Sequence, residues 1–226
     1  MVDASAPNAP QRRSPPARNL FDPVVMTIIG ICSLIEGAFV LSDLGLLDPP
    51  TLRSLGYQYG GFWPGLLRNW QPNYPGQPTL MFVTYAFLHG GPVHLLVNMI
   101  TLYSLGRAVV DRVGRLRFLA LYIASALAGA AGYAALSNTS IPMVGASGAL
   151  FGLAGAYIAW GYVDRFTARE RLWPIAQAVF LLILLNLVLW WAMDGQLAWQ
   201  THLGGFVGGW IMAMLLDPRS RVEPPV

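Results

Sequence analysis

Lysine is absent from this chain, cysteine occurs once, and charged residues of all kinds make up only 11% of the 226 residues. A water-soluble domain usually carries about 25% charged residues. Because 55% of this chain is hydrophobic, a soluble globular protein is excluded. The single cysteine, Cys32, excludes an intrachain disulfide and a metal cluster built on cysteine. No metal and no cofactor is expected.

The basic residues are all arginines, 14 in number, and the net charge is +3. A positive balance is compatible with nucleic-acid binding, but the arginines lie at the ends of apolar segments. That distribution is typical of membrane proteins rather than of phosphate-binding surfaces. The expected partner is therefore a lipid bilayer, and nucleic acid is not expected.

Six apolar runs are long enough to be considered as membrane-spanning helices, which take roughly 20 residues. They cover residues 24–44, 92–110, 118–136, 147–163, 172–192 and 199–216. The fourth and sixth are short and rich in glycine, which suits central helices shielded by their neighbours. Within the first run, Glu36 is interpreted as an acid near the interface or in a structural hydrogen bond.

The remaining segments differ in character from these runs. Residues 45–78 contain six prolines, so they cannot form one long helix, and their tryptophans favour the membrane interface. Residues 1–21 are rich in proline, alanine, serine and arginine and are expected to be a disordered cytoplasmic tail. The predicted architecture is one all-α membrane domain over residues 22–217, followed by a short cytoplasmic tail over 218–226.

The arginines also predict the orientation. Twelve of the 14 fall in the two tails, in the last turn of the second run, or in the segments after the second and fourth runs, and only Arg53 and Arg68 lie on the opposite side. Cytoplasmic segments of membrane proteins carry an excess of basic residues. The sequence therefore predicts six spans with both termini in the cytoplasm.

This orientation brings polar residues of three helices to one depth. The second, fourth and sixth runs all begin on the outer side, with His94 and Asn98, Ser147, and His202 near their starts. A lone serine in a membrane helix is usually a packing residue, and a lone histidine is often a structural bridge. Their combination indicates a catalytic serine, because His202 can act as a general base that accepts the proton of Ser147.

The same segments contain the other groups that serine attack on a carbonyl requires. His94 and Asn98 lie one turn apart on one helix face, and with the free backbone N–H of Ser147 they can donate hydrogen bonds to an oxyanion. Small-xxx-small pairs of glycines predict a close crossing of the fourth and sixth helices. They are Gly148 with Gly152, and Gly205 with Gly209.

Three motifs, taken together, resemble the rhomboid family of intramembrane serine proteases. They are His89-Gly-Gly-Pro-Val-His94-Leu-Leu-Val-Asn98, Gly145-Ala-Ser147-Gly148 and His202-Leu-Gly-Gly205. The resemblance implies a six-helix rhomboid-like bundle whose irregular loop between helices 1 and 2 is partly embedded in the outer leaflet. It also implies a Ser–His dyad without an acid.

Several residue roles follow from the resemblance alone. Ser147 would be the nucleophile and His202 the base, with His94, Asn98 and the Ser147 amide stabilising the oxyanion. His89 would be structural near the site, and Phe151 would stack on the catalytic histidine where some members have tyrosine. Gly145, Gly148 and Gly205 would support the site, and the fifth helix, with Trp190 and Trp191, would be a lateral gate.

One departure from the family pattern concerns the loop before the first histidine. Bacterial members often carry a Trp-Arg pair there, whereas residues 80–82 read Leu-Met-Phe.

The expected activity is endoproteolysis of single-pass or multi-pass membrane proteins near the outer face, and a bacterial plasma membrane fits the minimal core. Two alternatives are a catalytically silent rhomboid-like protein that binds membrane clients, and a transporter with His94 and His202 as a proton relay.

Overall fold

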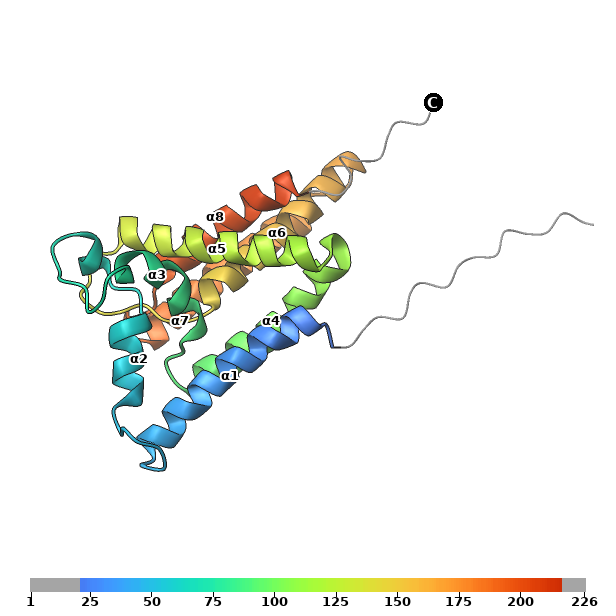
Figure 1. Ribbon diagram of the computed structural model, residues 1–226. Helices are drawn as coiled ribbons and strands as arrows, with labels where there is room; N and C mark the ends of the chain where they lie inside the picture. Colours follow the sequence, from blue (N-terminus) through green and yellow to red (C-terminus); the bar gives the residue numbers. More distant parts are fainter. Residues whose placement is uncertain (1–20, 217–226) are drawn as a thin grey trace, which may run out of the picture.

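The computed structural model describes residues 21–216, and every regular element in this part of the chain is a helix (Figure 1). The tails expected over 1–21 and 218–226 lie outside the described residues, apart from Phe21. The elements are α1 (Pro23–Asp43), α2 (Leu52–Gly60), η1 (Pro64–Leu67), α3 (Gln77–Thr84), η2 (Tyr85–Phe87), α4 (Pro92–Val113), α5 (Arg115–Leu136), α6 (Ser147–Thr167), α7 (Trp173–Ala192) and α8 (Trp199–Leu215).

Proline, glycine and one aspartate set the helix boundaries. Asp22 caps α1 by accepting a hydrogen bond from the backbone N–H of Val24 at 3.0 Å. Proline occupies the first turn of α1, α3, α4 and α7, where its missing N–H leaves no hydrogen bond unmade. Gly114, at φ +81°, separates α4 from α5, so the third apolar helix begins at Arg115 rather than at the expected residue 118.

The helix ends that carry the arginines gather at one end of the bundle. The Nε of Arg115 donates to Asp22 at 2.8 Å, which joins the α4–α5 turn to the start of α1. Arg112 pairs with Asp164 at 3.0 Å and joins the ends of α4 and α6. Helices α2 and α3 and their loops lie at the opposite end (Figure 1). The proline-rich segment is broken into α2, η1 and loops, as its composition predicts.

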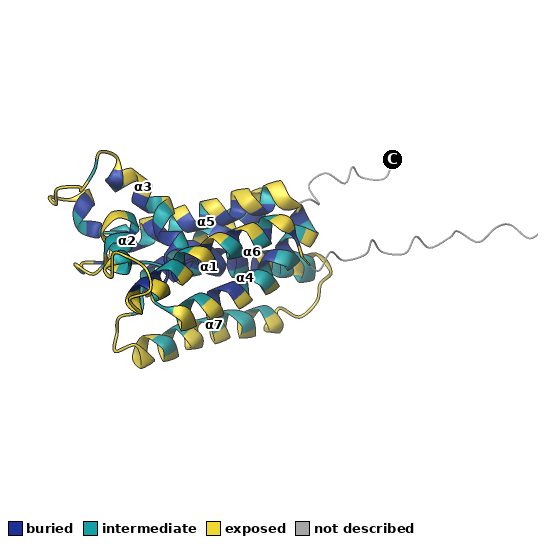
Figure 2. Cartoon of the chain, turned by 60° about the horizontal axis from the view of Figure 1, so that its bottom comes forward, coloured by how far each residue is buried: buried dark blue, intermediate teal, exposed yellow. Residues whose placement is uncertain are grey.

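Among the long helices, α6 and α7 are the extremes of burial, and α7 is drawn without the buried colour in Figure 2. Ten of the 21 residues of α6 are buried, whereas α7, all of which is described, has no buried residue. Glycines bring α6 and α8 into backbone contact. A Cβ on Gly205 would lie 1.9 Å from the carbonyl oxygen of Gly148, and one on Gly209 would lie 2.0 Å from that of Gly152.

Four of the described helices, α1, α4, α5 and α7, are long and apolar enough to cross a membrane. Helix α8 has only 17 residues, and α6 is diluted by glycine. The chain is therefore an integral membrane protein, and the glycine-rich α6 packs against α4, α5, α7 and α8.

Candidate active site

The segment before α6 is fixed by backbone hydrogen bonds, which set the position of Ser147. Phe62 and Met143 exchange N–H···O bonds of 2.9 and 3.0 Å. The N–H of Gly145 donates to the carbonyl of Tyr85 at 3.0 Å. The turn at Gly145 has φ +128°, a conformation that glycine adopts far more readily than other residues. Ser147 therefore enters the first turn of α6 from a held, extended segment.

Ser147 and His202 lie within hydrogen-bond distance. The Oγ of Ser147 is 2.9 Å from the Nε2 of His202, and the histidine is only 4% exposed. The ring of Phe151 stacks on the imidazole with centroids 4.1 Å apart and planes at 7°. The contact depends on the close α6–α8 crossing. Gly148 and Gly205 have no side chains there, and a Cβ at either position would push the two helices apart.

His94 lies beside Ser147 with its ring orientation fixed. The N–H of Gly90 donates to Nδ1 of His94 at 3.1 Å, so the neutral ring carries its proton on Nε2. A Cβ on Gly145 would lie 3.0 Å from that Nε2 and 3.8 Å from the Oγ of Ser147. The donor edge of His94 and the serine oxygen thus border the same small volume.

Two further donors were expected at this place. Ser147 is the first residue of α6, so its backbone N–H has no carbonyl within the helix to donate to. Asn98 is buried, and its amide nitrogen donates to the backbone carbonyl of His94 at 3.0 Å. One N–H of Asn98 is therefore directed along its own helix, and the other is available to a ligand.

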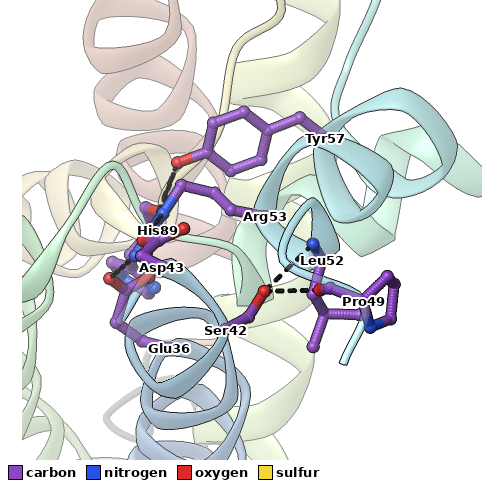
Figure 3. Close-up of polar contacts among 8 residues, drawn as sticks. All are labelled: Glu36, Ser42, Asp43, Pro49, Leu52, Arg53, Tyr57 and His89. Atoms are coloured by element: carbon purple, nitrogen blue, oxygen red, sulfur yellow. Dashed lines mark hydrogen bonds and ion pairs between the residues drawn. The ribbon is translucent and has the colours of Figure 1, made fainter. Parts of the chain in front are cut away.

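A network around Arg53 holds the loop before α4 (Figure 3). The guanidinium binds both carboxylate oxygens of Glu36, at 2.9 and 3.0 Å, and Asp43 at 2.7 Å. The carbonyl of His89 accepts from Arg53 at 3.2 Å and from the hydroxyl of Tyr57 at 2.7 Å. The hydrogen bond with Glu36 raises the pKa of Arg53 above its usual value. Glu36 thus makes the structural contact that its position in the first run favoured.

This network also concerns the expected structural histidine. His89 is fully buried, and its ring meets that of His94 edge to face, with centroids 5.3 Å apart. Leu80, in the stretch where family members often carry a Trp-Arg pair, lies in α3. The arginine that anchors the loop before α4 in this chain is Arg53 of α2, which sequence reasoning had noted only as one of two outer arginines.

Sequence reasoning also missed Asn186. Its Oδ1 lies 2.6 Å from the Nδ1 of His202, and its amide nitrogen donates to the carbonyl of Leu182 at 3.2 Å. The signal that could have found it is a carboxamide within the apolar run Leu-Leu-Ile-Leu-Leu-Asn-Leu-Val-Leu. Placing a polar side chain in the membrane costs free energy, so a polar residue in such a run is a functional candidate by default.

Together these contacts define the class of protein. It is an all-helical membrane protein in which a serine at a helix N-terminus contacts a buried histidine, with hydrogen-bond donors at the same place. Such an arrangement suits nucleophilic attack on a carbonyl. No group of three or more His, Cys, Asp or Glu side chains suited to a metal ion occurs among residues 21–216.

Comparison with known proteins identifies the family. Residues 77–219, more than half of the chain, match the family model of the Rhomboid domain. Over 140 residues the chain is 33% identical to RHOMBOID-like protein 5 of Arabidopsis thaliana, covering 62% of this chain and 44% of the relative. It is 34% identical over 134 residues to the rhomboid protease GluP of Bacillus subtilis, covering 59% and 25%. The chain belongs to the rhomboid family.

A longer alignment extends over most of the chain. It joins the chain to Rhomboid-like protease 1 of Toxoplasma gondii, with 29% identity over 205 residues, 88% of this chain and 62% of the relative. The chain thus spans between about a quarter and three fifths of the length of these three relatives. The family predicted from the three motifs is confirmed. Helices α1 and α2, which carry Glu36 and Arg53, precede residues 77–219, the part that the Rhomboid family model matches.

Proposed function

We propose that the chain is an intramembrane serine endopeptidase that cleaves transmembrane proteins near the outer membrane face. The observation that carries this proposal is the 2.9 Å contact between the Oγ of the partly buried Ser147 and the Nε2 of the buried His202. The similarity to the rhomboid protease GluP and to Rhomboid-like protease 1 of Toxoplasma gondii supports it.

The chemistry follows from the positions of these groups. Ser147 attacks the carbonyl carbon of the peptide bond while its hydroxyl proton passes to His202. The negative oxygen forms beside the N–H of Ser147, the Nε2–H of His94 and the amide of Asn98. The histidine then gives the proton to the departing amine. Water, activated by the same histidine, hydrolyses the acyl-enzyme and regenerates the serine.

The membrane arrangement is part of the proposal. Helices α6 and α8 complete a set of six spans with α1, α4, α5 and α7. Helix α6 is largely covered by its neighbours and needs less apolar surface of its own, whereas α8, although only 17 residues long, exposes Leu203, Val207 and Ile211 on one side. The arginine-bearing end of the bundle faces the cytoplasm, together with both termini. The site is then on the outer side, and a bacterial plasma membrane fits this topology.

Substrate access is proposed to involve α7. A cavity of about 620 Å³ lies along this helix and is lined by apolar residues together with Asn186 and His202. Trp190 of α7 and Trp199 of α8 are also in its lining. Helix α7 has no buried residue, so it can move away from the bundle at less expense than the other spans. A transmembrane segment entering beside it would reach His202, whose Nε2 lies 2.9 Å from the Oγ of Ser147.

A fluorophosphonate probe tests the nucleophile. The purified protein in detergent is labelled alongside Ser147→Ala and His202→Ala, with Ser104→Ala, a change at an exposed position of α4, as the matched control. We expect labelling of the wild type and of the control and loss of labelling in both site variants. Cleavage of a reporter transmembrane substrate should follow the same pattern.

Two results would change the assignment. If folded wild-type protein neither reacts with the probe nor cleaves the reporter, the chain is better described as a rhomboid-like protein that binds membrane clients. If Ser147→Ala keeps its function while His94 and His202 are required, a proton relay becomes the better explanation.

A further inference from the structure

The orientation of the Asn186 amide is determined by its own helix. The carbonyl of Leu182 can only accept a hydrogen bond, so the NH₂ group of Asn186 must face it, at 3.2 Å. The amide oxygen is thereby directed at the Nδ1 of His202, 2.6 Å away. An oxygen at this distance requires a donor.

The consequence for His202 is a single tautomer. With the proton on Nδ1, the ring donates to Asn186 and presents the lone pair of Nε2 to the hydroxyl of Ser147, 2.9 Å away. With the proton on Nε2, the lone pairs of Nδ1 and of the amide oxygen would face each other. The ring would then donate toward the serine instead of accepting from it.

We propose that Asn186 is a positioning residue of the catalytic site, which holds His202 in the tautomer that can accept the serine proton. The inference rests on the proposed serine-protease function. During the reaction the proton of Ser147 moves to Nε2, the Nδ1–H keeps its hydrogen bond to the oxygen of Asn186, and the Nε2 proton leaves with the amine. Asn186 itself neither gains nor loses a proton.

The residue comes from the most exposed spanning helix. Within residues 21–216, the contact with His202 is the only side-chain hydrogen bond that joins α7 to another helix. Asn186 also lines the cavity of about 620 Å³ beside His202. The site is therefore complete only when α7 stands in this position, since no other described side chain bonds to Nδ1.

The test compares Asn186→Leu, which has similar volume and no acceptor, with Asn186→Asp, which keeps an oxygen in place. Gln177→Leu is the matched control, because Gln177 is an exposed carboxamide on the same helix. The rate of fluorophosphonate labelling and the kcat and KM for a reporter transmembrane substrate are measured. We expect Asn186→Leu to lower kcat and labelling about 10- to 100-fold, part of the roughly 10²- to 10⁴-fold that general-base catalysis supplies. KM should stay within about twofold, while Asn186→Asp and the control stay active.

A second readout does not depend on proteolysis. The ring ¹⁵N chemical shifts of a histidine reveal which nitrogen carries the proton, and the chain has only three histidines. We expect the His202 proton on Nδ1 in the wild type and a mixture of tautomers in Asn186→Leu. An unchanged tautomer and wild-type kcat in Asn186→Leu would overturn the inference. An inactive wild type with the expected tautomer change would instead remove the protease assignment and leave the positioning contact in place.

Discussion

Removal of the Arg53 guanidinium should destabilise the fold, because it leaves the carboxylate of Glu36 buried without its partner. Glu36 is 1% exposed, and both of its oxygens bind the guanidinium, at 2.9 and 3.0 Å. Truncation of one member of a buried ion pair costs about 3–5 kcal/mol. For a domain of this size, 1 kcal/mol shifts Tm by roughly 2–4 °C. Arg53→Met should therefore lower Tm by roughly 6–20 °C.

The same reasoning predicts that a second substitution repairs most of the loss. In Glu36→Leu/Arg53→Met no charge remains buried without a partner, and apolar side chains replace a buried pair at little expense. Asp43 keeps solvent as a partner, and the carbonyl of His89 keeps the hydroxyl of Tyr57. The double variant should then lie within about 2 kcal/mol of the wild type, so the two changes are strongly non-additive.

Thermal unfolding in detergent, followed by tryptophan fluorescence and circular dichroism, measures these differences. Arg68→Met is the control, since this other outer arginine is exposed and donates to Ser137 and Asn138 rather than to a buried acid. Its Tm should move by only a few degrees. A Tm for Arg53→Met within about 2 °C of the wild type would refute the reasoning, as would a double variant whose loss equals the sum of the single losses.

Two further predictions concern the site and the end of the bundle that carries the arginines. Gly145→Ala would place a methyl group 2.8 Å from the Cε1 of His94 at a φ of +128°, so fluorophosphonate labelling should fall at least about 10²-fold. Gly114→Ala, which has a positive φ but open space around it, is the control and should keep its labelling rate. Burial raises the pKa of Asp22. Hydrogen bonds from Arg115 and from backbone amides together lower this pKa by more than burial raises it, so the pKa of Asp22 lies below the usual 3.8. The stabilisation by Asp22 is therefore fully present above about pH 4 and is lost as the pH falls below that value. Asp22→Asn keeps the helix cap and loses only the charge toward Arg115 and the helix N-terminus. Its unfolding, measured between pH 3 and 7, should show a loss of at most about 1 kcal/mol near neutrality and a weaker acid dependence than the wild type.

The parts of the site that sequence reasoning reached are those that local rules determine. The first residues of the second, fourth and sixth apolar runs must share a depth if the runs cross the membrane in alternation. That constraint alone groups His94, Ser147 and His202. The glycine pairs then bring α6 and α8 close together, because residues four apart share one helix face. Neither step needs knowledge of side-chain rotamers.

The parts that it did not reach depend on how helices rotate about their own axes. Asn186 binds His202 only because α7 turns that face of its apolar surface toward α8, and a helix with apolar residues all round contains no pattern that fixes its rotation. The pairing of Arg53 with Glu36 depends on the path of the chain between α1 and α2. No periodicity describes that path.

The two histidines beside Ser147 show why a list of motif residues does not yet assign chemistry. Both have the same side chain and both are held near the serine, yet their partners impose opposite roles. The N–H of Gly90 donates to Nδ1 of His94, which leaves Nε2 as a donor suited to an oxyanion. The oxygen of Asn186 accepts from Nδ1 of His202, which leaves Nε2 as an acceptor suited to the serine proton. The proposed base and the proposed oxyanion donor are therefore distinguished by one backbone amide and one carboxamide, neither of which would take part in the reaction.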